Sequence, residues 1–145
     1  MQSEVLTELI KKSSAGLAQA TTELGDKATW KPLDKGRSAI DQCVECGYVS
    51  MLIAGALNTQ GMPAFDRDGM NAAKAENDTP EKALAILASG TETLVAAIAS
   101  FPADQWDTVQ SLPHWGDHSF TDLVMYIHWN NVYHQGQVSY ISTLL

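Results

Sequence analysis

Residues 129–137 of the chain read WNNVYHQGQ, and this stretch places three polar side chains on one helical face. Asn130, His134 and Gln137 follow one another at spacings of four and three residues. Because an α-helix has about 3.6 residues per turn, side chains at these spacings lie one above another. The stretch therefore predicts a helix that carries a buried polar site into the interior of a helical bundle.

The rest of the chain is dominated by apolar residues that recur at helical spacing. We expect four helices, over residues 3–24, 38–57, 79–100 and 119–144. Residues 58–78 show no sustained period and are expected to form a long loop, and residues 108–112 a short extended piece. This pattern predicts one all-α domain over residues 1–145, a four-helix bundle.

Capping patterns precede three of these segments. Ser38 with Asp41 and Ser119 with Asp122 resemble capping boxes, in which each side chain binds the backbone N–H of the other residue. Thr79 is followed by proline and glutamate, a hydroxyl cap before residues suited to the first helical turn. These patterns predict where the second, third and fourth helices begin.

Composition and charge restrict the function classes. A net charge of -8 without clustered Lys and Arg disfavours nucleic acids and anionic membrane surfaces as partners, because both are polyanions. We also expect no membrane span, since no apolar run approaches about 20 residues. Residues 1–4 lack the cationic start of a secretion signal, and two cysteines do not make a disulfide framework. The chain is expected to be soluble and cytoplasmic.

Two short motifs carry a resemblance to a known family. Residues 133–137 read YHQGQ, and residues 30–32 read WKP, followed by Arg37 and Ser38. These motifs resemble those of the DinB-like family, which includes bacillithiol transferases and the metal-binding domain of mycothiol-dependent maleylpyruvate isomerase. The resemblance extends over nearly the whole chain and implies a four-helix bundle.

The resemblance also implies a metal site. In that family three histidines bind a divalent metal, and the matching positions here are Glu45, Asn130 and His134. Only one of the three is histidine, so a site for zinc, nickel, manganese or iron would be altered in this chain. Gln137, one turn beyond His134, is expected to orient His134 or a bound ligand.

Two functions follow from this departure, and the sequence leaves both open. As an enzyme, the bundle would hold a metal at Glu45, Asn130 and His134 and activate water or a low-molecular-weight thiol for hydrolysis or thiol transfer. Alternatively, it is non-catalytic: Glu45 and His134 form an ion pair or hydrogen bond that Asn130 completes, in a metal-free polar pocket for small-molecule binding. The absence of two imidazoles favours the second alternative.

The remaining candidate residues are read as structural. Cys43 and Cys46 form a Cys-x2-Cys motif inside a predicted helix, where two buried thiols are expected, and either could face the pocket. His114 and His118 flank Gly116 and are expected in a surface loop.

Self-association is a further expectation. Members of the family that the chain resembles often dimerise, which implies a homodimer. His128, Trp129 and residues 140–145 lie away from the predicted polar site and would supply a helix face for such a contact.

Overall fold

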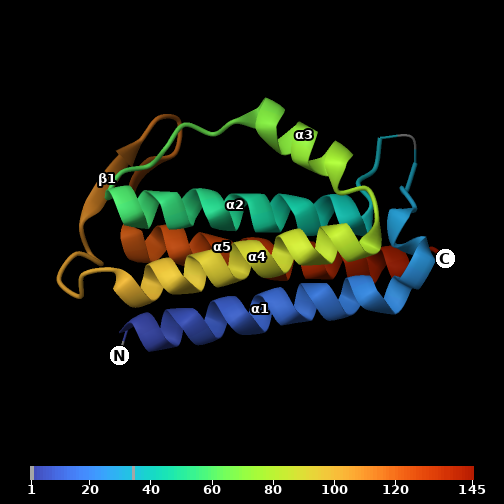
Figure 1. Cartoon of the computed structure of the whole chain (residues 1–145), viewed down its shortest axis with the longest axis horizontal. Helices are drawn as coiled ribbons and strands as arrows, with labels where there is room; N and C mark the ends of the chain where they lie inside the picture. The colour runs from blue at the N-terminus through green and yellow to red at the C-terminus, as the bar shows by residue number, and fades with distance from the viewer. Residues whose placement is uncertain (1, 34) are drawn as a thin grey trace.

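The computed structural model describes residues 2–33 and 35–145 and is largely helical. Its four long helices lie side by side (Figure 1). They are α1 (Gln2–Leu24), α2 (Ala39–Thr59), α4 (Pro80–Ser100) and α5 (Phe120–Ser142). Helix α2 packs mainly on α4, and α1 packs on both α5 and α4. The prediction of an all-α chain is confirmed in outline, with a small two-stranded sheet added.

The predicted helix starts are present. Ser38 Oγ accepts a hydrogen bond from the backbone N–H of Asp41 at 3.1 Å, and Asp41 accepts one from the N–H of Ser38 at 3.1 Å. Ser119 and Asp122 form the same reciprocal pair at the start of α5. Thr79 caps α4 and precedes a proline in its first turn. Each cap satisfies N–H groups that the first turn leaves unpaired.

The expected loop over residues 58–78 is wrong in part, because it contains a short helix, α3 (Arg67–Glu76). Asp66 caps this helix by accepting a hydrogen bond from Gly69 N–H at 2.9 Å. No residue of α3 is fully buried, and its apolar face is limited to a short half-buried patch at Met70 and Ala73, too small for a helical period to stand out in the sequence.

A β-hairpin precedes α5. Strand β1 (Val109–Leu112) matches the predicted extended piece and pairs antiparallel with β2 (Gly116–Ser119). The second strand replaces part of the expected surface loop and contains His118, whereas His114 lies in the turn. Both His114 and Gly116 have positive φ angles, 69° and 82°, which close the turn tightly.

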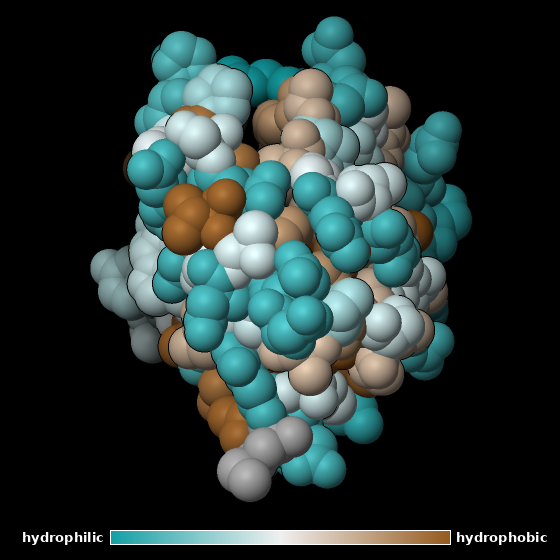
Figure 2. All heavy atoms as spheres, turned by 90° about the vertical axis from the view of Figure 1, so that its left-hand side faces the viewer, coloured by the Kyte–Doolittle hydropathy of each residue, from teal (hydrophilic) through white to brown (hydrophobic). Residues whose placement is uncertain are grey.

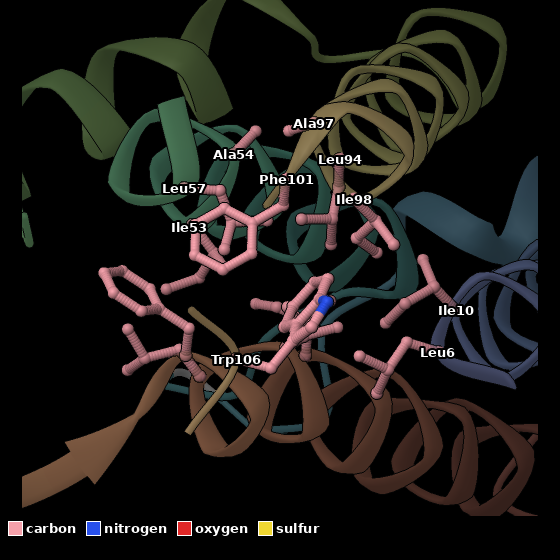
Figure 3. Packing of buried hydrophobic residues seen from close by; sticks show 14 of the residues in the cluster. Leu6, Ile10, Ile53, Ala54, Leu57, Leu94, Ala97, Ile98, Phe101 and Trp106 are labelled. Atoms are coloured by element: carbon pink, nitrogen blue, oxygen red, sulfur yellow. The ribbon is translucent and has the colours of Figure 1, made fainter. Parts of the chain in front are cut away.

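The apolar core has two parts. At the hairpin end, side chains from α1, α2 and α4 converge on Phe101 and Trp106 (Figure 3). The ring centroids of these two residues lie 4.5 Å apart, and Phe120 lies 4.9 Å from Phe101. Figure 2 shows the outer face of this end, which is covered mostly by hydrophilic residues with small separate hydrophobic patches.

The second part of the core surrounds Leu17, Val44, Leu87 and the two cysteines. Cys43 and Cys46 are fully buried and free, as predicted for structural thiols.

Two helices, α2 and α4, are long and apolar enough to cross a membrane by length and composition. The sequence-based exclusion of any such segment therefore does not hold on these two criteria. Both helices are also packed against each other, and 67% of the apolar window of α2 and 39% of that of α4 are buried. Burial of this kind is equally typical of core helices.

Helices α2 and α4 approach closely where two glycines meet. A Cβ atom on Gly47 would lie 2.5 Å from the Ile86 carbonyl oxygen, and one on Gly90 would collide with the backbone of Gly47. Larger residues at either position would therefore force the two helix backbones apart.

We expect Gly90→Ala to lower the free energy of unfolding by about 1–3 kcal/mol, because the added methyl group overpacks this contact. Gly55→Ala is the matched control, since Gly55 is also helical but a Cβ there meets nothing within 4 Å. In the control, the free energy of unfolding should rise by up to about 1 kcal/mol, because alanine has a higher helix propensity than glycine. Urea unfolding measures the stability of both variants. An equal gain in stability for Gly90→Ala and Gly55→Ala would contradict the close contact between α2 and α4.

Candidate functional site

A polar cluster lies where α2 and α5 face each other. Helix α2 supplies Gln42 and Glu45, and α5 supplies His134 and Gln137. Arg37 from the segment before α2 and Lys74 from α3 complete the cluster. The site is therefore formed by two core helices, α2 and α5, and by one side chain each from α3 and from the segment before α2.

Glu45 is the centre of this cluster. Its two carboxylate oxygens lie 3.1 and 3.0 Å from Arg37 Nη1, and Lys74 Nζ donates to Oε2 at 2.9 Å. His134 Nε2 lies 3.4 Å from Oε1. The Glu45 side chain is only 18% exposed, so these contacts take the place of the water that the carboxylate gives up.

These contacts also decide the ionisation of Glu45. Burial alone would raise its pKa, because it disfavours the charged form. The hydrogen bond with His134 and the charges of Lys74 and Arg37 outweigh burial and hold the pKa of Glu45 well below its usual range. Glu45 is therefore a fixed negative charge at neutral pH.

His134 is held from its other side by two amides. Its Nδ1 atom lies 2.8 Å from Gln42 Oε1 and 3.0 Å from Gln137 Oε1. Both neighbours are carbonyl oxygens, so Nδ1 carries a proton and donates to them. The ring is 2% exposed and its orientation is fixed by contacts on both nitrogens.

Asn130 stands apart from this cluster. It is buried, and its Nδ2 atom lies 3.5 Å from Cys46 Sγ. Of the three residues expected to bind a metal together, Glu45 and His134 are in contact, and Asn130 contacts a thiol. The amides that contact His134 are those of Gln42 and Gln137.

The donor set does not fit a divalent cation. Among residues 2–33 and 35–145, no group of three or more His, Cys, Asp or Glu side chains has the geometry to hold a metal ion. The carboxylate that would be the strongest ligand is already neutralised by Arg37 and Lys74. A metal bound to Glu45 would have to displace or face these two cations, at a Coulombic cost.

The two thiols are poorly suited to nucleophilic chemistry. Burial raises the pKa of Cys43 to about 11, although a contact with Thr21 opposes the shift. Burial, together with the neighbouring Cys43 and Glu45, raises the pKa of Cys46 well above its usual range. Both remain protonated at neutral pH, whereas thiol exchange requires the thiolate.

A pocket of about 480 Å³ opens beside the polar cluster. Its polar side is formed by Arg37, Gln42 and Gln137, which also make the contacts described above. The other lining residues are mainly apolar or aromatic: Pro32, Tyr133, Gly136, Tyr140, Ile141 and Leu144. Apolar walls with a few convergent polar groups are typical of small-molecule sites.

Three residues of this site were not among the sequence candidates for it. In the sequence, Arg37 stands out only as part of a short motif, although it lies just before the helix that carries Glu45. Gln42 lies one turn before Glu45, a spacing that could have pointed to it. Lys74 carried no signal, because its contact depends on how α3 folds back over α2 (Figure 1).

His128 lies outside the cluster. Its Nδ1 atom lies 3.3 Å from the backbone oxygen of Leu9, so the ring is directed toward α1. This placement on another surface agrees with its angular separation from His134 on the helix.

No family model and no curated protein sequence matches the chain. The resemblance to DinB-like proteins therefore stays a prediction that depends on the short motifs and the helix pattern.

We expect Glu45→Gln to lower the free energy of unfolding by roughly 2–3 kcal/mol at neutral pH, because two cations lose their buried counter-charge. The folded-state pKa of Glu45 is depressed, so its contribution is fully present above its ordinary pKa of about 4.3 and is lost as the pH falls below that value. The difference between wild type and variant should therefore shrink below about pH 4. Denaturant unfolding at several pH values measures it.

Glu92→Gln is the matched control, since Glu92 is exposed on α4. It should stay within about 0.5 kcal/mol of wild type at neutral pH. A stability difference for Glu45→Gln that grows on acidification would contradict the role given to the carboxylate.

Proposed function

We propose that the chain is a DinB-like four-helix bundle in which an ion-paired polar network takes the place of the metal site, and that it binds a small molecule without catalysing a reaction. One observation carries this proposal: the Glu45 carboxylate is shared by Arg37, Lys74 and His134. A carboxylate bound in this way holds a pocket in shape and leaves no free lone pairs for a cation.

The fold supports the first half of the proposal. Four long helices lie side by side, as the resemblance implies, and the YHQGQ motif lies on α5 with His134 directed into the interior. The WKP motif lies at the pocket, where Pro32 is a lining residue. The two motifs that suggested the family therefore belong to the same site.

The pocket supports the second half. Arg37, Gln42 and Gln137 offer donors and acceptors on one side, and Tyr133 and Tyr140 offer aromatic surface on the other. A volume of about 480 Å³ lies within the usual range for ligand pockets. Cytoplasmic location belongs to the same proposal, because two free buried thiols suit a reducing compartment.

Thiol transfer or hydrolysis at a metal site formed by Glu45, Asn130 and His134 stays a prediction. It would require zinc, nickel, manganese or iron to bind in place of the contacts of Glu45. The metal-free pocket leaves the contacts of Glu45 as they are in the structure, so we prefer this proposal.

Gly136 offers a direct test of the pocket. It lines the pocket, and a Cβ atom at this position meets nothing within 4 Å. Gly136→Leu should therefore fill the pocket without disturbing the fold. In an NMR screen of small neutral, anionic and cationic aromatic fragments, we expect wild-type binding to shift resonances of the lining residues and to survive treatment with EDTA, and we expect Gly136→Leu to abolish it.

Gly55→Leu serves as the control, because Gly55 is also helical with open space around it but lies outside the pocket. It should bind fragments as wild type does. Stoichiometric metal in protein purified without an affinity tag, lost in His134→Ala, would contradict the metal-free proposal, as would fragment binding that EDTA removes.

A second candidate function, self-association, is favoured by the outer face of α5. From residue 123 to residue 145 the chain contains no Asp, Glu, Lys or Arg, although its net charge is -8. The exposed side chains between these residues include large apolar ones that do not line the pocket, namely Met125, Trp129 and Val132. The rings of Trp129 and Tyr133 stack at 5.3 Å and form a flat surface.

We propose that a second copy of the chain covers this face. Two molecules of like charge repel each other, and they approach at least cost through an uncharged surface. Interface cores are enriched in aromatic residues and methionine and depleted of charge, as this face is. These properties support α5 as the surface of the proposed homodimer.

Val132→Glu should weaken dimerisation at least about a hundredfold, because it would bury two unpaired charges in the interface. Val5→Glu is the same substitution on α1, where the valine is 57% exposed, and should leave the dimer intact. Sedimentation velocity over a range of concentrations distinguishes the two. A wild-type protein that is monomeric throughout would remove this proposal.

A further inference from the structure

The charges of the polar cluster do not balance. Arg37 and Lys74 contribute two positive charges, and Glu45 contributes one negative charge. The nearest acid along α2, Asp41, pairs with Lys31 at 3.3 Å and caps its own helix. His134 contacts acceptors on both ring nitrogens and adds no negative charge, so in a chain with a net charge of -8 the pocket adjoins a site with at least one uncompensated positive charge.

Arg37 has hydrogen-bonding capacity that the cluster does not use. Its Nη1 atom contacts both oxygens of Glu45, and its Nη2 atom donates to Gln137 Oε1 at 3.3 Å. Within the part of the chain that the structure describes, no residue accepts a hydrogen bond from Nε. A guanidinium has five N–H groups in one plane, so Nε–H and one of the two Nη2–H groups are left unused. When Gln137 accepts from the Nη2–H that faces Nη1, these two remaining groups form a fork.

This fork belongs to a residue that lines the pocket and is 41% exposed. Paired, parallel N–H groups match the two oxygens of a carboxylate, and such pairing is the strongest that arginine makes. Glu45 and Gln137 hold the other edges of the guanidinium, so its orientation is set before a ligand arrives. Little side-chain entropy then remains to be lost on binding.

The remaining wall of the pocket is apolar. Tyr133 and Tyr140 offer aromatic surface, and Ile141 and Leu144 offer aliphatic surface. A ligand bound at the fork would therefore place its uncharged part against these side chains, whose contact is favourable in proportion to the apolar area buried.

We infer that the pocket selects a monoanionic carboxylate with an aromatic or aliphatic body, its carboxylate paired with Arg37 and its body packed on α5. This inference rests on the proposed small-molecule function and specifies its ligand class. The two oxygens of a carboxylate match one fork and offset positive charge in the cluster, whereas a phosphate would need more donors than one fork supplies.

The test compares 3-phenylpropionate and octanoate with their neutral amides, 3-phenylpropanamide and octanamide, by NMR titration. Wild-type protein should bind each carboxylate at least about tenfold more tightly than the matched amide, as a charge-assisted pair does. In Arg37→Gln this ratio should fall to near one, with the affinity for the amides unchanged within about twofold.

Two further variants sharpen the result. Arg37→Lys keeps the charge that neutralises Glu45 but removes the fork, so it should remain folded and lose most of the preference for carboxylates. Arg67→Gln is the matched control at the only other arginine of the chain, which is exposed at the start of α3. Arg67→Gln should bind each carboxylate more tightly than the matched amide by the same factor as wild type.

The outcomes separate this inference from the proposed function. Equal binding of carboxylates and amides by wild type, a preference that persists in Arg37→Gln, or tighter binding of inorganic phosphate would overturn the carboxylate inference and leave the pocket intact. If none of the four compounds binds, and the fragment screen finds no ligand that Gly136→Leu excludes, both the inference and the proposed function fail.

Discussion

Burial of the Glu45 carboxylate is the constraint on which the site depends. A charge removed from water must be paired and hydrogen-bonded, and no single neighbour meets that need. The chain meets it with three donors from three different places: the segment before α2, the short helix α3 and the fourth long helix, α5. One side chain thus draws together three elements that are far apart in the sequence.

The positions of the polar residues around Glu45 explain the shape of the pocket. Gln42, which accepts from His134, lies on α2, and α2 is held against α4 where Gly47 meets Gly90, while His134 lies on α5, which packs on α1 and α2. Arg37 lies on a connecting segment and reaches both Glu45 and Gln137. The result is a rigid polar floor with one side open, bordered by the aromatic residues of α5. Rigidity of this kind suits recognition, because the site is organised before a ligand binds.

The sequence predicted the four long helices and three of their caps, because these depend on local patterns: apolar spacing for the helices, and hydroxyl and carboxyl pairs such as Ser38 with Asp41 for the caps. It also predicted the burial of Cys43 and Cys46. It did not reveal α3, which has no buried stripe, or β2, whose residues Gly116 and Asp117 have little strand preference.

In the candidate site too, local sequence patterns predicted some features, whereas long-range packing decided others. Periodicity on α5 was enough to place His134 in the interior, and a spacing borrowed from a family was enough to bring Glu45 beside it. Neither could show that Lys74, 29 residues from Glu45, returns to pair with it. Asn130 illustrates the limit of a shared helical face: it lies one turn before His134, yet it points to Cys46 because the packing of α2 decides which neighbour it meets.

The limited burial of helix α3 has a consequence for local unfolding near the pocket. It buries no residue completely, and Lys74, through its ion pair with Glu45, is its polar link to the interior of the site. An element with so little buried surface detaches at a small fraction of the global unfolding free energy, so its amide protons exchange early while those of α2 and α5 stay protected. When α3 lifts away, Glu45 loses one of its two cations and Arg37 alone must balance it. The electrostatic state of the cavity therefore depends on whether α3 is docked, and by linkage a ligand that prefers one charge state of the cavity would favour the matching position of α3.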